Sequence, residues 1–196
     1  MFVELIDIES VINKAVSAGI CVLFSAGNGH LAFPACFPAV IAVGGATLNE
    51  DGSIEASSYA SGFSSKLYAG RNVPDICGLV GRSGASPQGA HIMLPVPPDS
   101  ALDGMNFPSG TKKSGWGIFS GTSAACPQVA GLVALMKQIS GTLTPAQIRQ
   151  VLQARAIDVA KGKTATGTSA RPGTDVATGA GLVDALRACG YVAGVP

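Results

Sequence analysis

The chain has 196 residues, of which 47% are hydrophobic and 13% are charged, so it can form one globular domain with a large core. Its net charge of +1 gives no electrostatic basis for binding nucleic acid or an anionic surface, and no nucleic-acid motif is present. No apolar run approaches the roughly 18 residues of a membrane helix, and the N-terminus lacks the basic flank and long apolar core of a signal peptide.

The N-terminal residues predict a helix followed by a strand. Between residues 8 and 18, Ile8, Val11, Ile12, Ala15 and Val16 recur at helical spacing, and Gly19 ends the pattern. Residues 22–25 form an apolar run that predicts a buried strand, with Asn28 just beyond its carboxyl end. An amide at that end of a strand in an open α/β sheet is where ligands bind. Taken alone, the sequence A-G-N favours a simple turn, in which Asn tolerates a left-handed conformation.

The middle of the chain predicts a second buried strand over residues 37–45 and a structural role for Asp75. Between residues 81 and 115 the composition shifts to Pro, Gly and Ser, which predicts a surface insertion. Within it, His91 precedes a predicted short strand over residues 92–96. Residues 161–173 predict a second polar loop.

The most informative stretch covers residues 119–131, which read F-S-G-T-S-A-A-C-P-Q-V-A-G. From Ala124 onward the apolar spacing predicts a helix that ends near residues 140–141, with Pro127 in its first turn. Gly121 and Ala124 leave Ser123 accessible to a bulky substrate, and free N–H groups of the first turn can stabilise negative charge beside it. The alternative is that Ser123 simply caps a core helix.

The C-terminal part predicts two further helices. Thr144 and Pro145 are typical of a helix start, and residues 178–186 predict a glycine turn followed by the last helix. Five cysteines show no C-x-x-C spacing, which favours free buried thiols, with Cys21 and Cys126 in core elements, over a zinc site or a disulfide framework. They are Cys21, Cys36, Cys77, Cys126 and Cys189.

The string G-T-S-A-A-x-P-x-V-A-G, together with the A-G-N segment, resembles the subtilases, which are subtilisin-like serine peptidases of family S8. Similarity extends over most of the chain and is strongest at residues 20–48 and 115–155. The resemblance implies an α/β, three-layer fold with a mainly parallel sheet flanked by helices. It implies that residues 1–196 form a single partial catalytic domain, lacking the N-terminal part.

The resemblance also implies roles for individual residues. Ser123 would attack a peptide bond of a peptide or protein substrate and form an acyl-enzyme, and Asn28 would donate to the oxyanion together with the Ser123 N–H. The residues expected to contact the substrate are Ser25, Ala26, Gly27 and Gly121. No cofactor is implied. A structural calcium ion would follow from family analogy alone, because no local acidic cluster supports it. Subtilases are often exported, although this chain carries no recognisable signal.

The Asp and His of the subtilase triad have no counterpart in this sequence, because neither a D-T-G-like nor an H-G-T-H-like string occurs. We therefore expect this chain alone to be a poor catalyst, with an upstream segment or a second chain supplying the pair. Missing parallel strands would leave the strand at residues 21–25 as an exposed edge. His30 and His91 are the only histidines that could replace the base.

Two alternatives stay open. One is a non-catalytic remnant or peptide-binding scaffold. The other is a sedolisin-like serine peptidase, a related family that uses Glu and Asp partners. The Asn28 segment favours the subtilisin branch, because the sedolisin oxyanion donor is an Asp.

Overall fold

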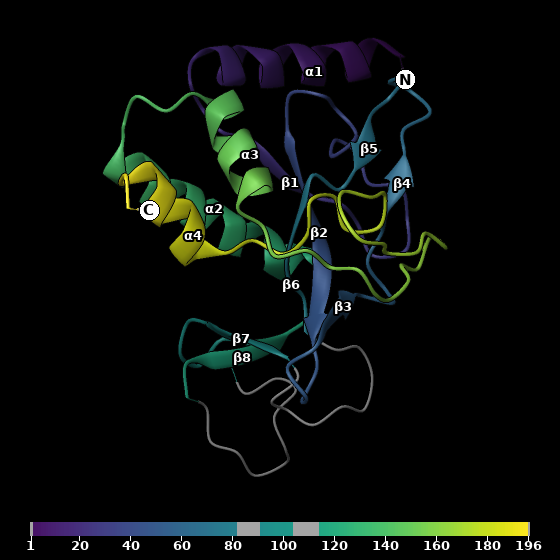
Figure 1. Cartoon of the computed structure of the whole chain (residues 1–196), viewed down its shortest axis with the longest axis vertical. Coiled ribbons are helices and arrows are strands. Elements are labelled where there is room, and N and C mark those ends of the chain that lie inside the picture. The colour runs from purple at the N-terminus through teal and green to yellow at the C-terminus, as the bar shows by residue number, and fades with distance from the viewer. Residues whose placement is uncertain (1, 82–90, 104–113, 196) are drawn as a thin grey trace.

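The computed structural model describes residues 2–81, 91–103 and 114–195 (Figure 1). The elements in chain order are α1 (Phe2–Ser17), β1 (Leu23–Ser25), β2 (Ile41–Leu48), β3 (Ile54–Ala56), β4 (Phe63–Ser64), β5 (Asn72–Val73), β6 (Ile76–Leu79), β7 (Ile92–Pro95), β8 (Trp116–Phe119), α2 (Thr122–Ile139), α3 (Pro145–Ala154) and α4 (Ala185–Val192). None of the helices in these ranges is long and apolar enough to cross a membrane.

The main sheet is built around β2. Strands β1 and β6 both run parallel to it, and they lie on opposite sides because Val43 pairs with Ser25 of β1 and with Ile76 of β6. Strand β3 pairs antiparallel with the end of β2. Among the described residues no other strand pairs with β1, so β1 is an edge of the sheet, as the sequence predicts. It is half-buried rather than buried, which corrects the expectation drawn from its apolar run.

One face of the sheet packs against three helices. Ile41 and Val43 of β2 form a core cluster with Val129 and Met136 of α2, which also includes residues of α3 and α4. All four of these residues are at most 2% exposed. Helix α2 therefore forms the centre of the domain, with α3 and α4 beside it (Figure 1).

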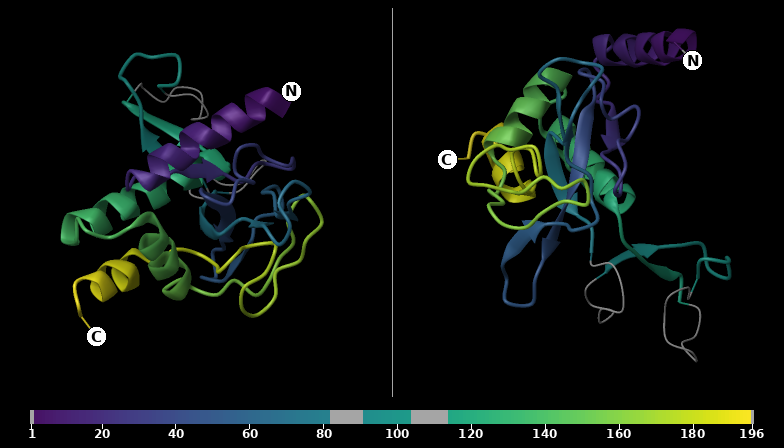
Figure 2. Two further views of the ribbon diagram at one scale, coloured as in Figure 1. Left: turned by 90° about the horizontal axis from the view of Figure 1, so that it is seen from above. Right: turned by 90° about the vertical axis from the view of Figure 1, so that its right-hand side faces the viewer.

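The opposite face packs against the segment before β2 and one side of α1. Ile12 of α1 lies in a second cluster with Phe37 and Ala42. Ile8 and Val11, predicted to share the buried stripe, are 41% and 65% exposed. The reason is that α1 lies across one end of the molecule rather than flat on the sheet (Figure 2), so only a narrow stripe is covered.

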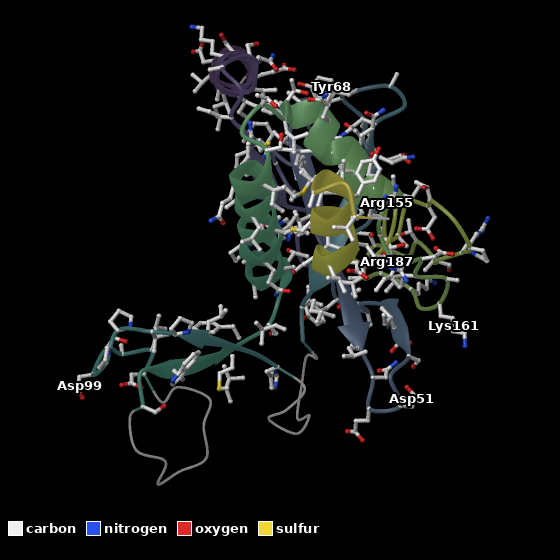
Figure 3. The ribbon with its side chains drawn as sticks, turned by 60° about the vertical axis from the view of Figure 1, so that its left-hand side comes forward. Asp51, Tyr68, Asp99, Arg155, Lys161 and Arg187 are labelled. Carbon is white, nitrogen blue, oxygen red and sulfur yellow. The ribbon has the colours of Figure 1, made fainter. Side chains whose placement is uncertain are left out.

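A pair of short strands projects from the end of the molecule opposite α1 (Figure 2). Strand β7 pairs antiparallel with β8, with Ile92 opposite Phe119. Asp99 lies at the far tip of this pair of strands (Figure 3). Asp103 is 6% exposed and accepts backbone N–H groups from Asp99, Ser114 and Gly115. The predicted surface insertion at 81–115 thus contains a strand, as predicted for residues 92–96. Residues 82–90 and 104–113 lie outside the described residues.

Two local predictions are confirmed. Helix α3 begins with a reciprocal capping box between Thr144 and Gln147, followed by Pro145. Asp75 is structural, because its carboxylate accepts bonds from Arg71 at 2.5 and 2.8 Å and from the Ala42 N–H at 2.7 Å.

Candidate active site

Ser123 lies in the first turn of α2, just after the glycine at which the helix begins. The N-cap is Gly121, with φ 114° and ψ 161°, a conformation that L side chains rarely adopt. Its carbonyl accepts the N–H groups of Ala124 at 2.9 Å and Ala125 at 3.3 Å. Ser123 is therefore the second helical residue, with an exposed side chain, and does not cap the helix.

The start of α2 corrects one expectation. The helix begins at Thr122, two residues before the predicted start, because the unusual backbone of Gly121 turns the chain directly from β8 into the helix. Pro127 consequently lies inside the helix, in its second turn rather than its first. Proline has no N–H, so the carbonyl of Ser123 lacks the usual helical partner four residues along.

Asn28 lies in a tight turn at the carboxyl end of β1. It stands between Gly27 and Gly29, whose φ angles are +104° and +86°. A Cβ atom on Gly27 would lie 2.7 Å from the carbonyl oxygen of His30, so this turn accepts no side chain there. The turn leaves the Asn28 side chain exposed, as Ser123 is.

The two predicted motifs meet through Thr122. The Asn28 Oδ1 accepts both the backbone N–H and the hydroxyl of Thr122, each at 3.0 Å. The Thr122 Oγ1 in turn accepts the N–H of Gly27 at 3.2 Å. These groups are 94 and 95 residues apart in the chain. Thr122 stands within the serine motif, but no pattern in the sequence indicates this bridging role.

These bonds leave two N–H donors, the Asn28 Nδ2 and the Ser123 backbone N–H, at the start of α2. Because Asn28 Oδ1 faces Thr122, its Nδ2 lies at the other end of the amide, near Gly121, where a Cβ atom added to the glycine would be 3.1 Å away. Within the described ranges, neither this Nδ2 nor the Ser123 N–H donates to a protein acceptor. The other first-turn N–H groups are used by Asn28 and Gly121. Two adjacent donors of this kind can stabilise an oxyanion.

A cysteine also lies on α2, three residues after Ser123. Burial raises the pKa of the Cys126 thiol, and no described side chain counteracts this shift. The thiol is therefore protonated at neutral pH and a weak nucleophile. Ser123 is the exposed nucleophilic side chain at this helix start.

Comparisons with known proteins identify the family of this chain. A family model described as "Subtilase family" matches residues 6–181. The chain belongs to the subtilase family. Subtilisin E of Bacillus subtilis (strain 168) is 31% identical over 156 residues, which cover 76% of this chain and 32% of that protein. Subtilisin-like protease SBT1.6 of Arabidopsis thaliana is 31% identical over 191 residues, covering 80% of this chain and 24% of that protein.

Solved structures show the same fold. Fervidolysin from Fervidobacterium pennivorans, a keratinolytic enzyme related to subtilisin, superposes with a TM-score of 0.65 at 27% identity, over 92% of this subtilase chain and 24% of that one. A lanthipeptide protease gives a TM-score of 0.68 over 93% of this chain and 54% of that one, at 24% identity. The predicted subtilisin-like α/β fold is thus confirmed. The chain spans about a third of the length of the subtilisins that it matches.

The other predicted subtilase site residues lie close to Asn28 or to Ser123 in the chain. Ser25 is half-buried at the end of β1, whereas Ala26, Gly27 and Gly121 are buried. The Ala26 side chain is 0% exposed and lies in the second core cluster, so it reaches no open surface. Contact between these four residues and a substrate stays a prediction.

Neither histidine forms a hydrogen bond with Ser123 in the part of the chain that the structure describes. His30 is exposed, and its carbonyl accepts the Ser61 hydroxyl at 2.6 Å. His91 is half-buried and precedes β7, whose Ile92 pairs with Phe119. This pairing brings His91 nearer to the serine turn than its place in the sequence indicates.

The five cysteines are all free, as predicted. Cys36 and Cys77 are buried, whereas Cys21 and Cys126, expected in the core, are half-buried. Across the described residues, no group of three or more His, Cys, Asp or Glu side chains could hold a metal ion. The calcium ion suggested by family analogy stays a prediction.

Proposed function

We propose that this chain is the nucleophile-bearing part of a subtilisin-like serine endopeptidase that acts on peptide or protein substrates. The observation that supports this most is the pair of hydrogen bonds from Thr122 to Asn28. They hold an exposed serine and an exposed carboxamide, far apart in sequence, at one helix start.

The proposed chemistry is acyl transfer. The Ser123 Oγ attacks the peptide carbonyl, and its proton passes to a base. The Asn28 Nδ2 and the Ser123 N–H donate to the carbonyl oxygen as it becomes negative, and the positive end of the α2 dipole adds to this stabilisation. The amine then leaves with a proton from the base, and water releases the acyl group from Ser123. Ser25, Gly27 and Gly121 contact the bound substrate, and Ala26 takes part only through its backbone because its side chain is buried in the core.

The base and its orienting acid come from another segment in this proposal. A serine hydroxyl is a weak nucleophile unless an adjacent base accepts its proton, and no side chain in the described residues does so for Ser123. We propose that an upstream segment or a second chain contributes the Asp and His. The open edge at β1 is where a further parallel strand could pair.

Two other functions compete with this proposal. The lack of recognisable Asp and His motifs favours a non-catalytic remnant or a peptide-binding scaffold. Against it, a scaffold requires neither an exposed serine nor an oriented carboxamide. A sedolisin-like peptidase fragment is the second alternative, and the amide at Asn28 opposes it.

Fluorophosphonate labelling tests the proposal. The chain is incubated with the probe alone and with a separately expressed subtilase segment that carries the Asp and His motifs, and the modified residue is mapped by mass spectrometry. We expect labelling at Ser123 that increases when the segment is added and disappears in Ser123→Ala. An unlabelled Ser123 in the presence of the folded, associated segment would refute the peptidase proposal.

A further inference from the structure

The segment between β3 and β4 contacts both turns of the candidate site. Tyr59 and Ser61, two residues apart, each place a hydroxyl against one turn: Tyr59 reaches the start of α2, and Ser61 reaches the Asn28 turn. Neither residue belongs to the serine motif or to the A-G-N segment. No sequence pattern singles out either of them.

Tyr59 joins the end of β6 to the first residue of the α2 turn. Its hydroxyl accepts the Gly121 N–H at 3.0 Å and donates to the Val80 carbonyl at 2.6 Å, with the Gly81 carbonyl at 3.0 Å. The Gly121 N–H also donates to Val80 at 3.0 Å. The phenol thus closes a small ring of hydrogen bonds around the N-cap of the helix that carries Ser123.

Ser61 holds the turn that carries Asn28. It is 0% exposed, and its hydroxyl accepts the Gly29 N–H at 3.0 Å while donating to the His30 carbonyl at 2.6 Å. Its backbone N–H donates to the Gly27 carbonyl at 2.9 Å. One buried residue therefore fixes the backbone on both sides of Asn28.

The segment itself is anchored to the body of the domain. The Ser57 N–H donates to Gly45 of β2 at 3.0 Å, and the Ala60 carbonyl accepts the N–H of Ala165 at 2.9 Å. A displacement of either active-site turn must therefore break bonds to a fixed segment. Hydrogen bonds to buried groups resist such displacement because an unpaired partner is costly.

We propose that Tyr59 and Ser61 are positioning residues, which together hold the Ser123 turn and the Asn28 turn in fixed relative positions. Neither touches the reacting atoms. The catalytic consequence rests on the proposed peptidase function, whereas the positioning itself does not.

Amide hydrogen exchange, measured by NMR on the folded chain, tests the positioning directly. In Tyr59→Phe we expect amide exchange at Gly121 to become about tenfold faster while exchange at Gly29 stays unchanged. In Ser61→Ala we expect exchange at Gly29 to become about tenfold faster while exchange at Gly121 stays unchanged. The amide of Leu132, in the middle of α2, reports global opening and should not change in either variant. Tyr68→Phe is the matched control, since Tyr68 lies at the end of the molecule away from the β7–β8 pair (Figure 3).

Unchanged exchange at both glycines, or an equal acceleration at Leu132, would overturn the positioning role.

A second readout is the kinetics of fluorophosphonate labelling in the complemented protein, which is this chain together with the added segment that carries the Asp and His motifs. We expect Tyr59→Phe to lower the maximal labelling rate about tenfold with little change in the half-saturating probe concentration; a change in the latter alone would contradict the proposal. If Ser123 is never labelled, the peptidase proposal fails, and the exchange rates alone decide the positioning role.

Discussion

The bond between the two motifs predicts a specific loss of stability when the Thr122 hydroxyl is removed. Thr122 is 0% exposed, and its Oγ1 serves as donor to Asn28 and as acceptor for Gly27. Thr122→Val keeps the shape of the side chain and deletes both bonds. The variant therefore tests the hydrogen bonds without opening a cavity.

The expected magnitude follows from the partners left behind. The Gly27 N–H is buried and loses its acceptor, which costs about 1–3 kcal/mol. Asn28 Oδ1 keeps the Thr122 N–H, so the second lost bond costs only about 1 kcal/mol. We expect Thr122→Val to lower the free energy of unfolding by about 3 kcal/mol.

Urea denaturation followed by circular dichroism measures this change. Thr122→Ser is the matched control, because it keeps the hydroxyl and removes one methyl group, at a cost of about 1 kcal/mol. A Thr122→Val variant within about 0.5 kcal/mol of the wild type, or an equally destabilised Thr122→Ser, would show that the two hydroxyl bonds do not stabilise the fold as predicted.

Three further predictions concern the oxyanion donor, a buried ion pair and a buried thiol. In the complemented protein, Asn28→Ala should slow fluorophosphonate labelling about 100-fold, the lower end of the range known for subtilisin's own oxyanion donor; an unchanged rate would exclude the amide from the site. Asp75→Asn should lower the free energy of unfolding by about 3 kcal/mol, since it removes the carboxylate charge that pairs with the guanidinium of Arg71, whose side chain is only 10% exposed. Asp184→Asn, at an exposed pair, should change it by less than about 0.5 kcal/mol, and equal urea midpoints for the two variants would contradict this contrast. Burial raises the pKa of Cys77 above its ordinary value of 9.0, so the thiol ionises more readily when unfolded and stability should fall as pH rises above that value. Urea midpoints from pH 8 to pH 10 should fall less in Cys77→Ala, and identical slopes would rule this out.

Those parts of the site that depend on local sequence could be predicted. The serine motif and the A-G-N segment each identify a turn by residues that are adjacent in the chain. The same holds for the capping box of Thr144 and Gln147, where spacing alone fixes the contact. In each case the residue types and the structure they form lie within one turn of backbone.

The rest depends on contacts between distant segments. Nothing near Tyr59 or Ser61 in the sequence indicates that their hydroxyls meet turns 62 and 32 residues away. Apolar spacing places the start of α2 two residues late, because it does not reveal the backbone conformation of Gly121. It also predicts a buried Val11, because periodicity identifies an apolar stripe but not how much of it a neighbouring layer covers.

The central claim is that Ser123 and Asn28 act on one reacting carbonyl. A crystal structure of the complemented protein with a phosphonate bound to Ser123 tests it most directly, because the phosphonyl oxygen occupies the place of the oxyanion. We predict that this oxygen lies about 2.7–3.1 Å from both Asn28 Nδ2 and the Ser123 nitrogen. A phosphonyl oxygen that points into solvent, away from the Asn28 amide, would contradict the claim.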